Sequence, residues 1–334
     1  MSDNRAGGQF AGSGAPYALA AYGIWGIAPV YFKLVGFATP FEIIAHRIVW
    51  SVLILLGVVL VRRQFYALRH LPWSRIGWLG VSGALISINW CVFVWALLNE
   101  RMLETSLGYY INPLVNVLLG MLFLGERLRI WQTVAVLLAG AGVLNEVVSL
   151  GSLPWVGLTL AGTFGLYGLV RKKLAVDSII GLGVETSLLL PLALGYLVLQ
   201  AFTGEGTLFR AMPAEIGLLG LGGLITVIPL ACFAAAAMRM PLVVLGFFQY
   251  LAPTLTLLLA VFVYHEPFRP SQAVTFACIW LALLLFSGEG LYRQFRLRRR
   301  TQAIAGSVCL KGEESDEVDA KQMRGKAMIE REMR

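Results

Sequence analysis

The sequence predicts an all-α integral membrane protein whose ten transmembrane helices form two inverted five-helix repeats. Composition is the first observation behind this prediction: 58% of the 334 residues are hydrophobic and 14% are charged, too little polar surface to coat a soluble globule. The second is a pattern written twice, about 140 residues apart. It pairs Pro113, Glu126, Arg129 and Gln132 with Pro253, Glu266, Arg269 and Gln272. Such internal symmetry is typical of duplicated transporter folds.

Ten stretches of the chain are long and apolar enough to cross a membrane. A helix needs about 20 apolar residues to span about 30 Å of hydrocarbon, and charge or turn clusters cut the chain into such pieces. We expect helices at residues 16–35, 41–61, 77–98, 105–124, 131–148, 154–170, 179–201, 214–238, 242–264 and 271–291. The expected organisation is a cytoplasmic leader (1–15), a first repeat (16–149), a second repeat (150–291) and a charged cytoplasmic tail (292–334).

The charged residues between these helices predict the topology. The leader is polar and no small-residue cleavage site follows the first span, so this span should be retained. With the amino terminus in the cytoplasm, sixteen of the basic residues up to Arg300 lie on that side and only Lys33, Arg101, Arg210 and Arg269 on the other. This distribution satisfies the positive-inside rule with both termini inside. The net charge of +8 therefore reports topology, and no nucleic-acid partner is expected.

The repeat also constrains the architecture. The matched spans, four and five against nine and ten, are separated by an odd number of helices, so the halves must run oppositely through the membrane. A weaker match pairs residues 22–26 with residues 164–168, and Glu42 with Glu185. Two inverted units place a pseudo-twofold axis in the membrane plane and a solute site near the bilayer midplane. The cysteines lie in spans and in the tail, and predict no disulfide framework.

Several motifs together resemble a known family. They are residues 20–22, 24–29, His46-Arg47, Asn89-Trp90, 106–127, Phe164 with 167–173, Glu185-Thr186 and 245–254. With these, the chain resembles the RarD proteins of the EamA branch of the drug/metabolite transporter superfamily. The resemblance implies ten helices in two inverted EamA-type repeats, a bacterial inner-membrane location and a role as a permease. The family name carries a link to chloramphenicol resistance, and the resemblance supplies no physiological substrate.

Span two holds the densest group of charged residues within the hydrocarbon. Glu42 and His46 are four apart and share a helix face, while Arg47 is turned about 100° away. A buried charge is costly and persists only where it is paired or useful. In the functional interpretation, Arg47 attracts an anionic or polar solute and His46 relays a proton. In the alternative, Glu42 and Arg47 form a structural network near the interface.

Glu185 is the acidic residue deep in span seven. It takes up protons during transport in one interpretation, because burial disfavours the charged carboxylate. In the other, it forms an ion pair with the Arg171–Lys173 cluster at the cytoplasmic surface. The sequence favours neither interpretation.

Pro113 and Pro253 lie in the middle of spans and cannot donate to the carbonyls of Tyr109 and Gln249. We expect each helix to kink there, with the freed carbonyls lining a polar cavity. The side chains that would join this cavity are those of Tyr110, Asn112, Asn116, Gln249 and Tyr250. A plain packing kink is the alternative. If the repeats flank one site, replacing either proline should impair transport comparably.

Aromatic and amide side chains of spans one and three are further candidates. Trp25, Asn89 and Trp90 suit a planar or amphiphilic solute. The alternative is interhelical hydrogen bonding and interfacial anchoring. Glu126 and Glu266 lie in short loops near Arg129 and Arg269, where we expect turn salt bridges or caps that fix the helix pairs.

These features favour a secondary permease that exports a small organic solute by alternating access, with protons as the coupling ion. The expected partners are that solute, protons and the lipid bilayer; a homodimer is left open, and no cofactor or metal is expected. The sequence shows no nucleophile with a base, no metal-ligand cluster and no phosphate-binding loop. The alternatives are an intramembrane enzyme without a recognisable catalytic motif and a membrane receptor or scaffold.

Overall fold

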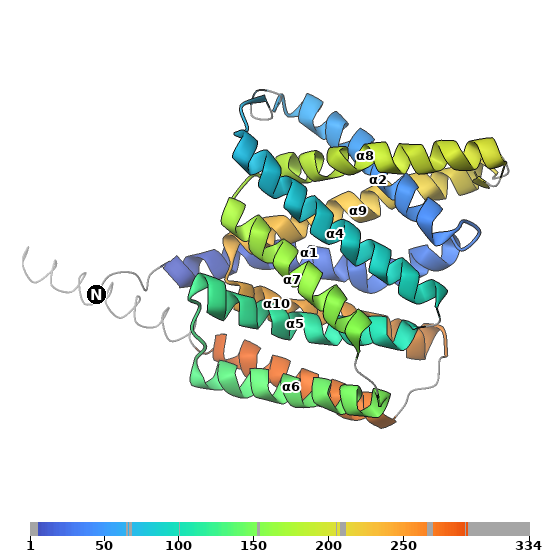
Figure 1. Cartoon of the computed structure of the whole chain (residues 1–334). Helices are drawn as coiled ribbons and strands as arrows, with labels where there is room; N and C mark the ends of the chain where they lie inside the picture. Colours follow the sequence, from blue (N-terminus) through green and yellow to red (C-terminus); the bar gives the residue numbers. More distant parts are fainter. Residues whose placement is uncertain are drawn as a thin grey trace, which may run out of the picture. The chain divides into compact units, whose positions relative to one another are not determined.

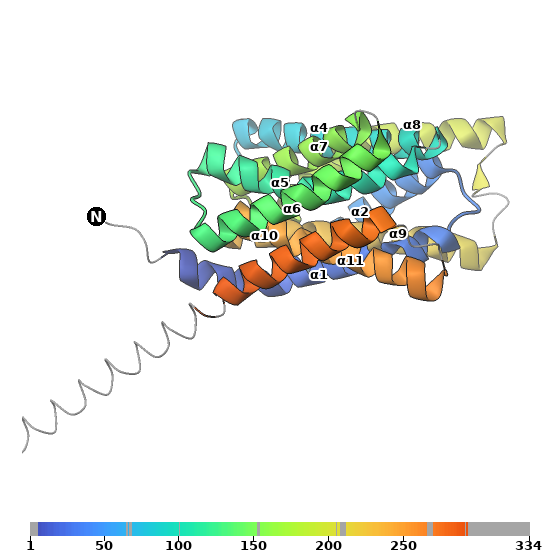
Figure 2. The ribbon, with the colours of Figure 1, turned by 90° about the horizontal axis from the view of Figure 1, so that it is seen from below.

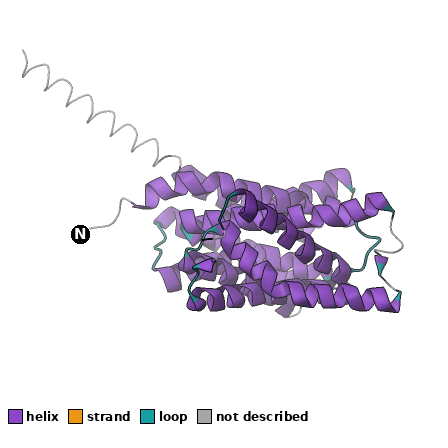
Figure 3. Ribbon diagram, turned by 90° about the horizontal axis from the view of Figure 1, so that it is seen from above, coloured by secondary structure: helices purple, strands orange, loops and turns teal. Residues whose placement is uncertain are grey.

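A computed structural model describes residues 6–64, 66, 69–99, 101–151, 154–204, 206–207, 212–265, 270–290 and 292. Its regular structure in these ranges is helical throughout (Figure 3). Residues 1–282 form one compact unit and residues 283–334 a second. The expected charged tail lies outside the described residues apart from Tyr292.

Ten helical segments cross the described part of the chain (Figure 1). They are α1 (Ala6–Leu34), α2 (Pro40–Val61), α4 (Trp73–Leu98), α5 (Met102–Leu124), α6 (Ile130–Leu150), α7 (Trp155–Leu174), α8 (Ser178–Thr203), α9 (Pro213–Arg239), the run of α10 (Leu242–Gln249), α11 (Leu251–Leu258) and the π-helical turn η2 (Leu259–Val263), and a last helix Pro270–Gly290. Ten helices are therefore present where ten were expected, and eight of them meet the length and hydropathy of a membrane span. The first boundary was wrong, because α1 begins ten residues early and residues 6–15 of the expected leader are helical.

Local sequence explains where several helices begin and end. Thr39 caps α2, because its hydroxyl accepts the backbone N–H of Glu42 at 3.4 Å. Asp177 caps α8 by accepting the N–H of Ile179 at 3.0 Å and of Ile180 at 3.2 Å. Helices α5, α6 and α8 each end at a glycine with positive φ, the conformation that glycine adopts without strain.

Eight of these helices are long and apolar enough to cross a membrane, so the chain is a multi-pass membrane protein. The other two, α1 and α7, contain many glycine and aromatic residues, and α7 ends in three basic residues. These two helices pack among others, α1 against α9 and α11, and α7 against α4 and α5 (Figures 1 and 2). A helix surrounded by protein needs less hydrophobic surface than one that faces lipid.

Small residues let the helix backbones approach closely. A Cβ on Gly157 of α7 would lie 2.8 Å from the carbonyl oxygen of Glu104 in α5, and one on Gly246 of α10 would lie 2.8 Å from that of Pro113. Close backbone approach at glycine is the usual packing device between membrane helices.

The two helices with mid-span prolines differ. Helix α5 continues without interruption through Pro113, whereas its counterpart breaks at Tyr250, between α10 and α11. The two proline-containing spans therefore differ in where the regular helix is interrupted, and the kinks expected at Pro113 and Pro253 stay predictions. Both segments nevertheless end alike, since Gly125 after α5 and His265 after η2 have φ of 64° and 53°.

Candidate functional site

Arg47 of α2 lies among helices from both halves of the chain. Its Nε donates to the Thr226 hydroxyl of α9 at 2.8 Å, and its guanidinium carbon lies 5.0 Å from the ring centre of Trp90 and 5.5 Å from that of Phe32. No carboxylate pairs with Arg47 among the residues described. Aromatic faces attract a cation, but they leave its charge unneutralised.

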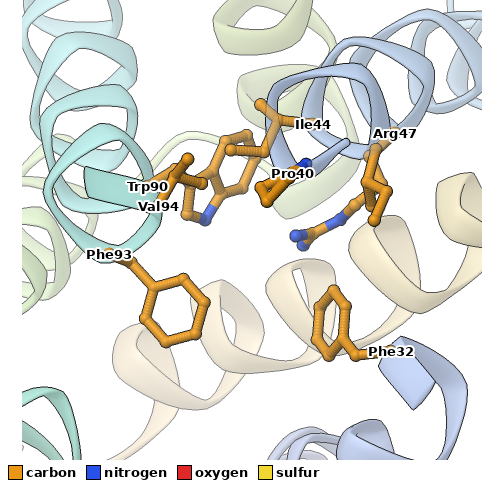
Figure 4. Close-up of a pocket in the computed structure, with 8 residues that line it drawn as sticks. Phe32, Pro40, Ile44, Arg47, Trp90, Phe93 and Val94 are labelled. Atoms are coloured by element: carbon orange, nitrogen blue, oxygen red, sulfur yellow. The ribbon is translucent and has the colours of Figure 1, made fainter. Parts of the chain in front are cut away.

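The Arg47 guanidinium points into a small cavity (Figure 4). The cavity has a volume of about 60 Å³. Its walls are otherwise apolar or aromatic and comprise Phe32, Pro40, Ile43, Ile44, Trp90, Phe93 and Val94. We call this space the Arg47 cavity. Such a lining with one convergent charged group is typical of small-molecule sites.

Glycine and tyrosine complete the surroundings of Arg47. A Cβ on Gly222 of α9 would lie 2.5 Å from the Tyr31 hydroxyl and 2.9 Å from the Cγ of Arg47, so only glycine leaves room for both. The buried Tyr31 hydroxyl has no hydrogen-bond partner within the described ranges. Tyr109, which is 51% exposed, is also close enough for electrostatic interaction with Arg47.

Glu42 bonds to Thr207 and makes no described hydrogen bond or ion pair with Arg47, its partner in the alternative interpretation. Both carboxylate oxygens of buried Glu42 accept from Thr207: one accepts the backbone N–H at 2.7 Å and the other the hydroxyl. Glu42 thus ties the start of α2 to the segment after α8. The buried Nε2 of His46 lacks a partner in the described structure.

The mid-span amides and tyrosines meet where α5 crosses α10. The Asn116 amide donates to Oε1 of Gln249, and the Tyr250 hydroxyl donates to the Tyr110 carbonyl at 3.4 Å. Tyr250 and Tyr110 are equivalent positions of the two repeats. Asn112 is buried nearby along α5, and its Oδ1 has no described partner. These residues form a polar contact between the halves, separate from the Arg47 cavity lining.

The candidates from α1 and α4 divide between the two interpretations. Trp90 lines the Arg47 cavity. Asn89 instead donates to the Leu160 carbonyl at 2.8 Å and the Thr163 hydroxyl at 2.9 Å, which ties α4 to α7. Trp25 packs in an aromatic cluster whose other members are Tyr22, Phe164, Tyr167 and Phe233. Pro253 lies in α11, outside the cavity lining.

Glu185 lies in a buried polar network. Its Oε1 accepts from Ser82 at 2.7 Å and forms an ion pair with Arg171 at 3.3 Å, while Oε2 accepts from Tyr167 at 3.4 Å. Both members of the ion pair are 1% exposed. The pairing with the basic cluster, one of the two interpretations, is present, and the pair is enclosed by protein. Gly181 is required here, because a Cβ on it would lie 1.8 Å from Arg171 Nη1.

The next basic residue, Lys172, faces the other way. Its Nζ donates to the carbonyls of Ala237 and Met240 at the end of α9 and lies 3.8 Å from Glu126. Glu126 in turn accepts the backbone N–H groups that open α10, those of Leu242 and Val243, each at 2.8 Å. Glu126 therefore acts as the expected cap, but for a helix of the other half. Glu266 and Arg269 lie outside the described residues.

One acidic residue of the spans was missed by the sequence analysis. Glu146 of α6 accepts from the Thr275 hydroxyl at 3.0 Å, and Asn145 beside it donates to the Ser271 carbonyl and to Thr275. The sequence could have indicated Glu146, because it is an acidic residue inside the expected span 131–148. In the described part of the chain, no three His, Cys, Asp or Glu residues cluster to hold a metal ion.

Comparison with known proteins gives this geometry a family. The EamA-like transporter family matches residues 12–145. Protein RarD of Escherichia coli is 48% identical over 286 residues, which cover 85% of this chain and 96% of that protein. The chain belongs to the EamA-like transporter family. The resemblance to RarD proteins is thereby confirmed.

Other family members agree over nearly the same length. An uncharacterized transporter of Vibrio cholerae is 46% identical over 87% of this chain and 97% of its own. The chloramphenicol-sensitive protein RarD of Pseudomonas aeruginosa is 36% identical over 83% of this chain and 94% of its own. A protein of known crystal structure shares the fold with a TM-score of 0.64 at 21% identity, covering 82% of this chain and 96% of its own.

Three residues near Arg47 were not among the site residues predicted for this EamA-like transporter: Thr226, Phe32 and Phe93. Thr226 is 179 residues from Arg47 along the chain, and Phe32 and Phe93 belong to α1 and α4. Phe32 and Phe93 are ordinary apolar positions of their spans, and Thr226 is one of many small polar residues in spans, so no signal in the sequence separated them from packing residues.

Proposed function

We propose that this protein is a secondary transporter that exports a small organic solute by alternating access, with the Arg47 cavity as its solute site. The observation that carries this proposal is the unneutralised charge of Arg47 in a cavity lined by aromatic side chains. A charge inside a membrane protein is costly unless it serves a pathway or a ligand. The membership of a transporter family supports the same function.

The contacts between helices support two inverted repeats. In such an arrangement each helix has a counterpart in the other half: α1 and α7, α2 and α8, α4 and α9, and α5 and the pair α10–α11. When each helix is replaced by its counterpart, most pairs of neighbouring helices become other pairs of neighbours. Helix α1 packs on α9 as α7 packs on α4, and α5 packs on α7 as α11 packs on α1. Pairs α2–α8 and α5–α10 map onto themselves. These self-pairs would surround the pseudo-twofold axis, and alternating access would rock one repeat against the other.

Closure at one end of the bundle supports alternating access. The contacts of Glu126 and Lys172 join the α5–α6 loop, α7, α9 and α10 at the end where α5 and α9 finish. The Arg47 cavity lies toward the other end, near the start of α2. We place the Glu126 end on the cytoplasmic side of the inner membrane, because the loops with most basic residues would lie on that side.

Protons are the proposed coupling ion, and His46 is the proposed relay. It lies beside Arg47 in sequence with a buried, unpartnered Nε2, whereas Glu185 is already paired with Arg171. An imidazole can take up and release a proton at a ring nitrogen, which is the chemistry that a relay needs.

Uptake into proteoliposomes tests this function. The panel would hold amino acids, organic acids and amphenicols, the last because one relative is named chloramphenicol-sensitive. Flux should require the protein, increase with a pH gradient, and fall in Arg47→Gln but not in Arg239→Gln, whose guanidinium bonds the Ala235 carbonyl at the far end of α9. Flux without gradient dependence would remove the proton step, and flux unaffected by Arg47→Gln would remove the site.

A further inference from the structure

We propose that the Arg47 cavity selects a monocarboxylate with a flat, apolar body and without an ammonium group. This inference rests on the proposed function and names its class of substrate. It follows from the free donors of Arg47, from the charge balance of the site and from the chemistry of its walls.

The first step concerns the donors. Arg47 Nε is engaged by Thr226, so the two terminal nitrogens are left, and they point into the cavity between Phe32 and Trp90 (Figure 4). Neither terminal nitrogen has a protein acceptor in the ranges that the structure describes. Two parallel N–H groups at the end of a guanidinium match the two oxygens of a carboxylate. Fixing Nε on α9 also fixes the plane in which that carboxylate would lie.

The second step concerns charge. Arg47 is the single charged residue among the described residues that line the cavity, so one negative charge on the solute balances this lining. The nearest acidic residue on the same helix, Glu42, has both oxygens engaged by Thr207. Among the residues that the structure describes, an ammonium group on the solute would therefore meet no carboxylate in the cavity lining, and a second carboxylate would meet no second cation there. Either charge would be desolvated without a partner, which is strongly unfavourable.

The third step concerns the body of the solute. Apart from Arg47, the cavity is lined by aromatic rings and by aliphatic side chains such as Ile43, Ile44 and Val94. Aromatic faces on two sides favour a flat apolar group. A volume of about 60 Å³ is well below the roughly 300–1,000 Å³ of sites that enclose a whole small organic molecule. The body would therefore enter when the bundle opens at this end.

Equilibrium binding to the purified protein in detergent, measured by titration calorimetry at pH 7.5, tests the inference. The probes share one phenyl body: 3-phenylpropanoate, its neutral amide, phenylalanine and phenylsuccinate. We expect 3-phenylpropanoate to bind at least about ten-fold more tightly than the other three. Arg47→Gln should remove this preference, and Arg47→Lys should weaken it, because a point charge lacks the paired donors. Arg239→Gln should retain it.

Equal binding of the amide or phenylalanine, a preference that survives in Arg47→Gln, or no binding of any probe would overturn the inference. Flux measurements separate this failure from failure of the proposed function. Arg47-dependent flux of a neutral or zwitterionic solute would overturn the monocarboxylate class while leaving the transporter intact. Absence of flux for the whole panel would overturn the proposed function itself.

Discussion

Arg47 and Arg171 are two arginines inside the helical bundle with opposite surroundings. Arg171 is 1% exposed, paired with Glu185 and enclosed so tightly that residue 181 must be glycine. Arg47 has a hydroxyl and two aromatic rings as neighbours and a cavity in front of its terminal nitrogens. The difference teaches that burial of a charge alone does not mark a functional site. A neutralised charge holds helices together, whereas an unneutralised one is available to a ligand.

Removing the charge of Arg171 should have the largest effect, on stability. Arg171→Gln leaves Glu185 buried without a cation, which costs about 3–5 kcal/mol. Thermal unfolding in detergent should show a large fall in midpoint, with loss of protein from the membrane. The double variant Arg171→Met with Glu185→Leu should recover most of the stability. A stable Arg171→Gln protein with impaired flux would break the contrast by giving Arg171 a role in transport.

Removing the charge of Arg47 should affect function and spare stability. A charged hydrogen bond contributes about 1.5–3 kcal/mol, so the net loss of one such bond in Arg47→Gln should lower solute affinity about 10- to 100-fold. Its unfolding midpoint should stay the same or rise, since no carboxylate loses a partner. Transport rates against solute concentration, alongside thermal unfolding, measure both. A large fall in stability would place Arg47 with Arg171 as a structural residue.

The contact between Glu126 and α10 should have a smaller effect. Glu126→Ala removes a cap on Leu242 and Val243, worth about 1 kcal/mol, and loosens the closed end. A cysteine placed at Val243 should then react faster with a membrane-impermeant maleimide. The matched control is Glu215→Ala, because Glu215 caps only its own helix through the Met212 N–H. Equal labelling in both variants would argue that the Glu126 contact does not hold this end closed.

Asn89→Ala should have the smallest effect. Its two hydrogen bonds go to α7 and none to the cavity, and such interhelical bonds average about 0.6 kcal/mol in membranes. We expect slightly reduced stability and unchanged solute affinity. A strong loss of affinity would extend the functional region from Trp90 to its neighbour.

The helices could be predicted from the sequence because hydrophobic length is a local property. Arg47 was singled out as a candidate for the same kind of reason, since a charge in hydrocarbon demands an explanation wherever it lies, and the pairing of Glu185 with the basic cluster was one of two interpretations left open. What could not be predicted was how each helix is rotated against its neighbours. Thr226 reaches Arg47, and Glu126 reaches α10, only through packing between the halves. A span rich in apolar residues on every face gives no periodicity from which that rotation could be read.

If the interruption at Tyr250, where the backbone keeps right-handed helical angles, acts as a hinge, α10 moves as a rigid arm. Eight helical residues give an arm of about 12 Å, with its pivot at Tyr250 and its tip at Leu242, where Glu126 holds it. A tilt of only about 10° would carry the tip about 2 Å, enough to part both N–H groups from the carboxylate. A small rotation at the middle of the bilayer would thus be magnified into release at its edge.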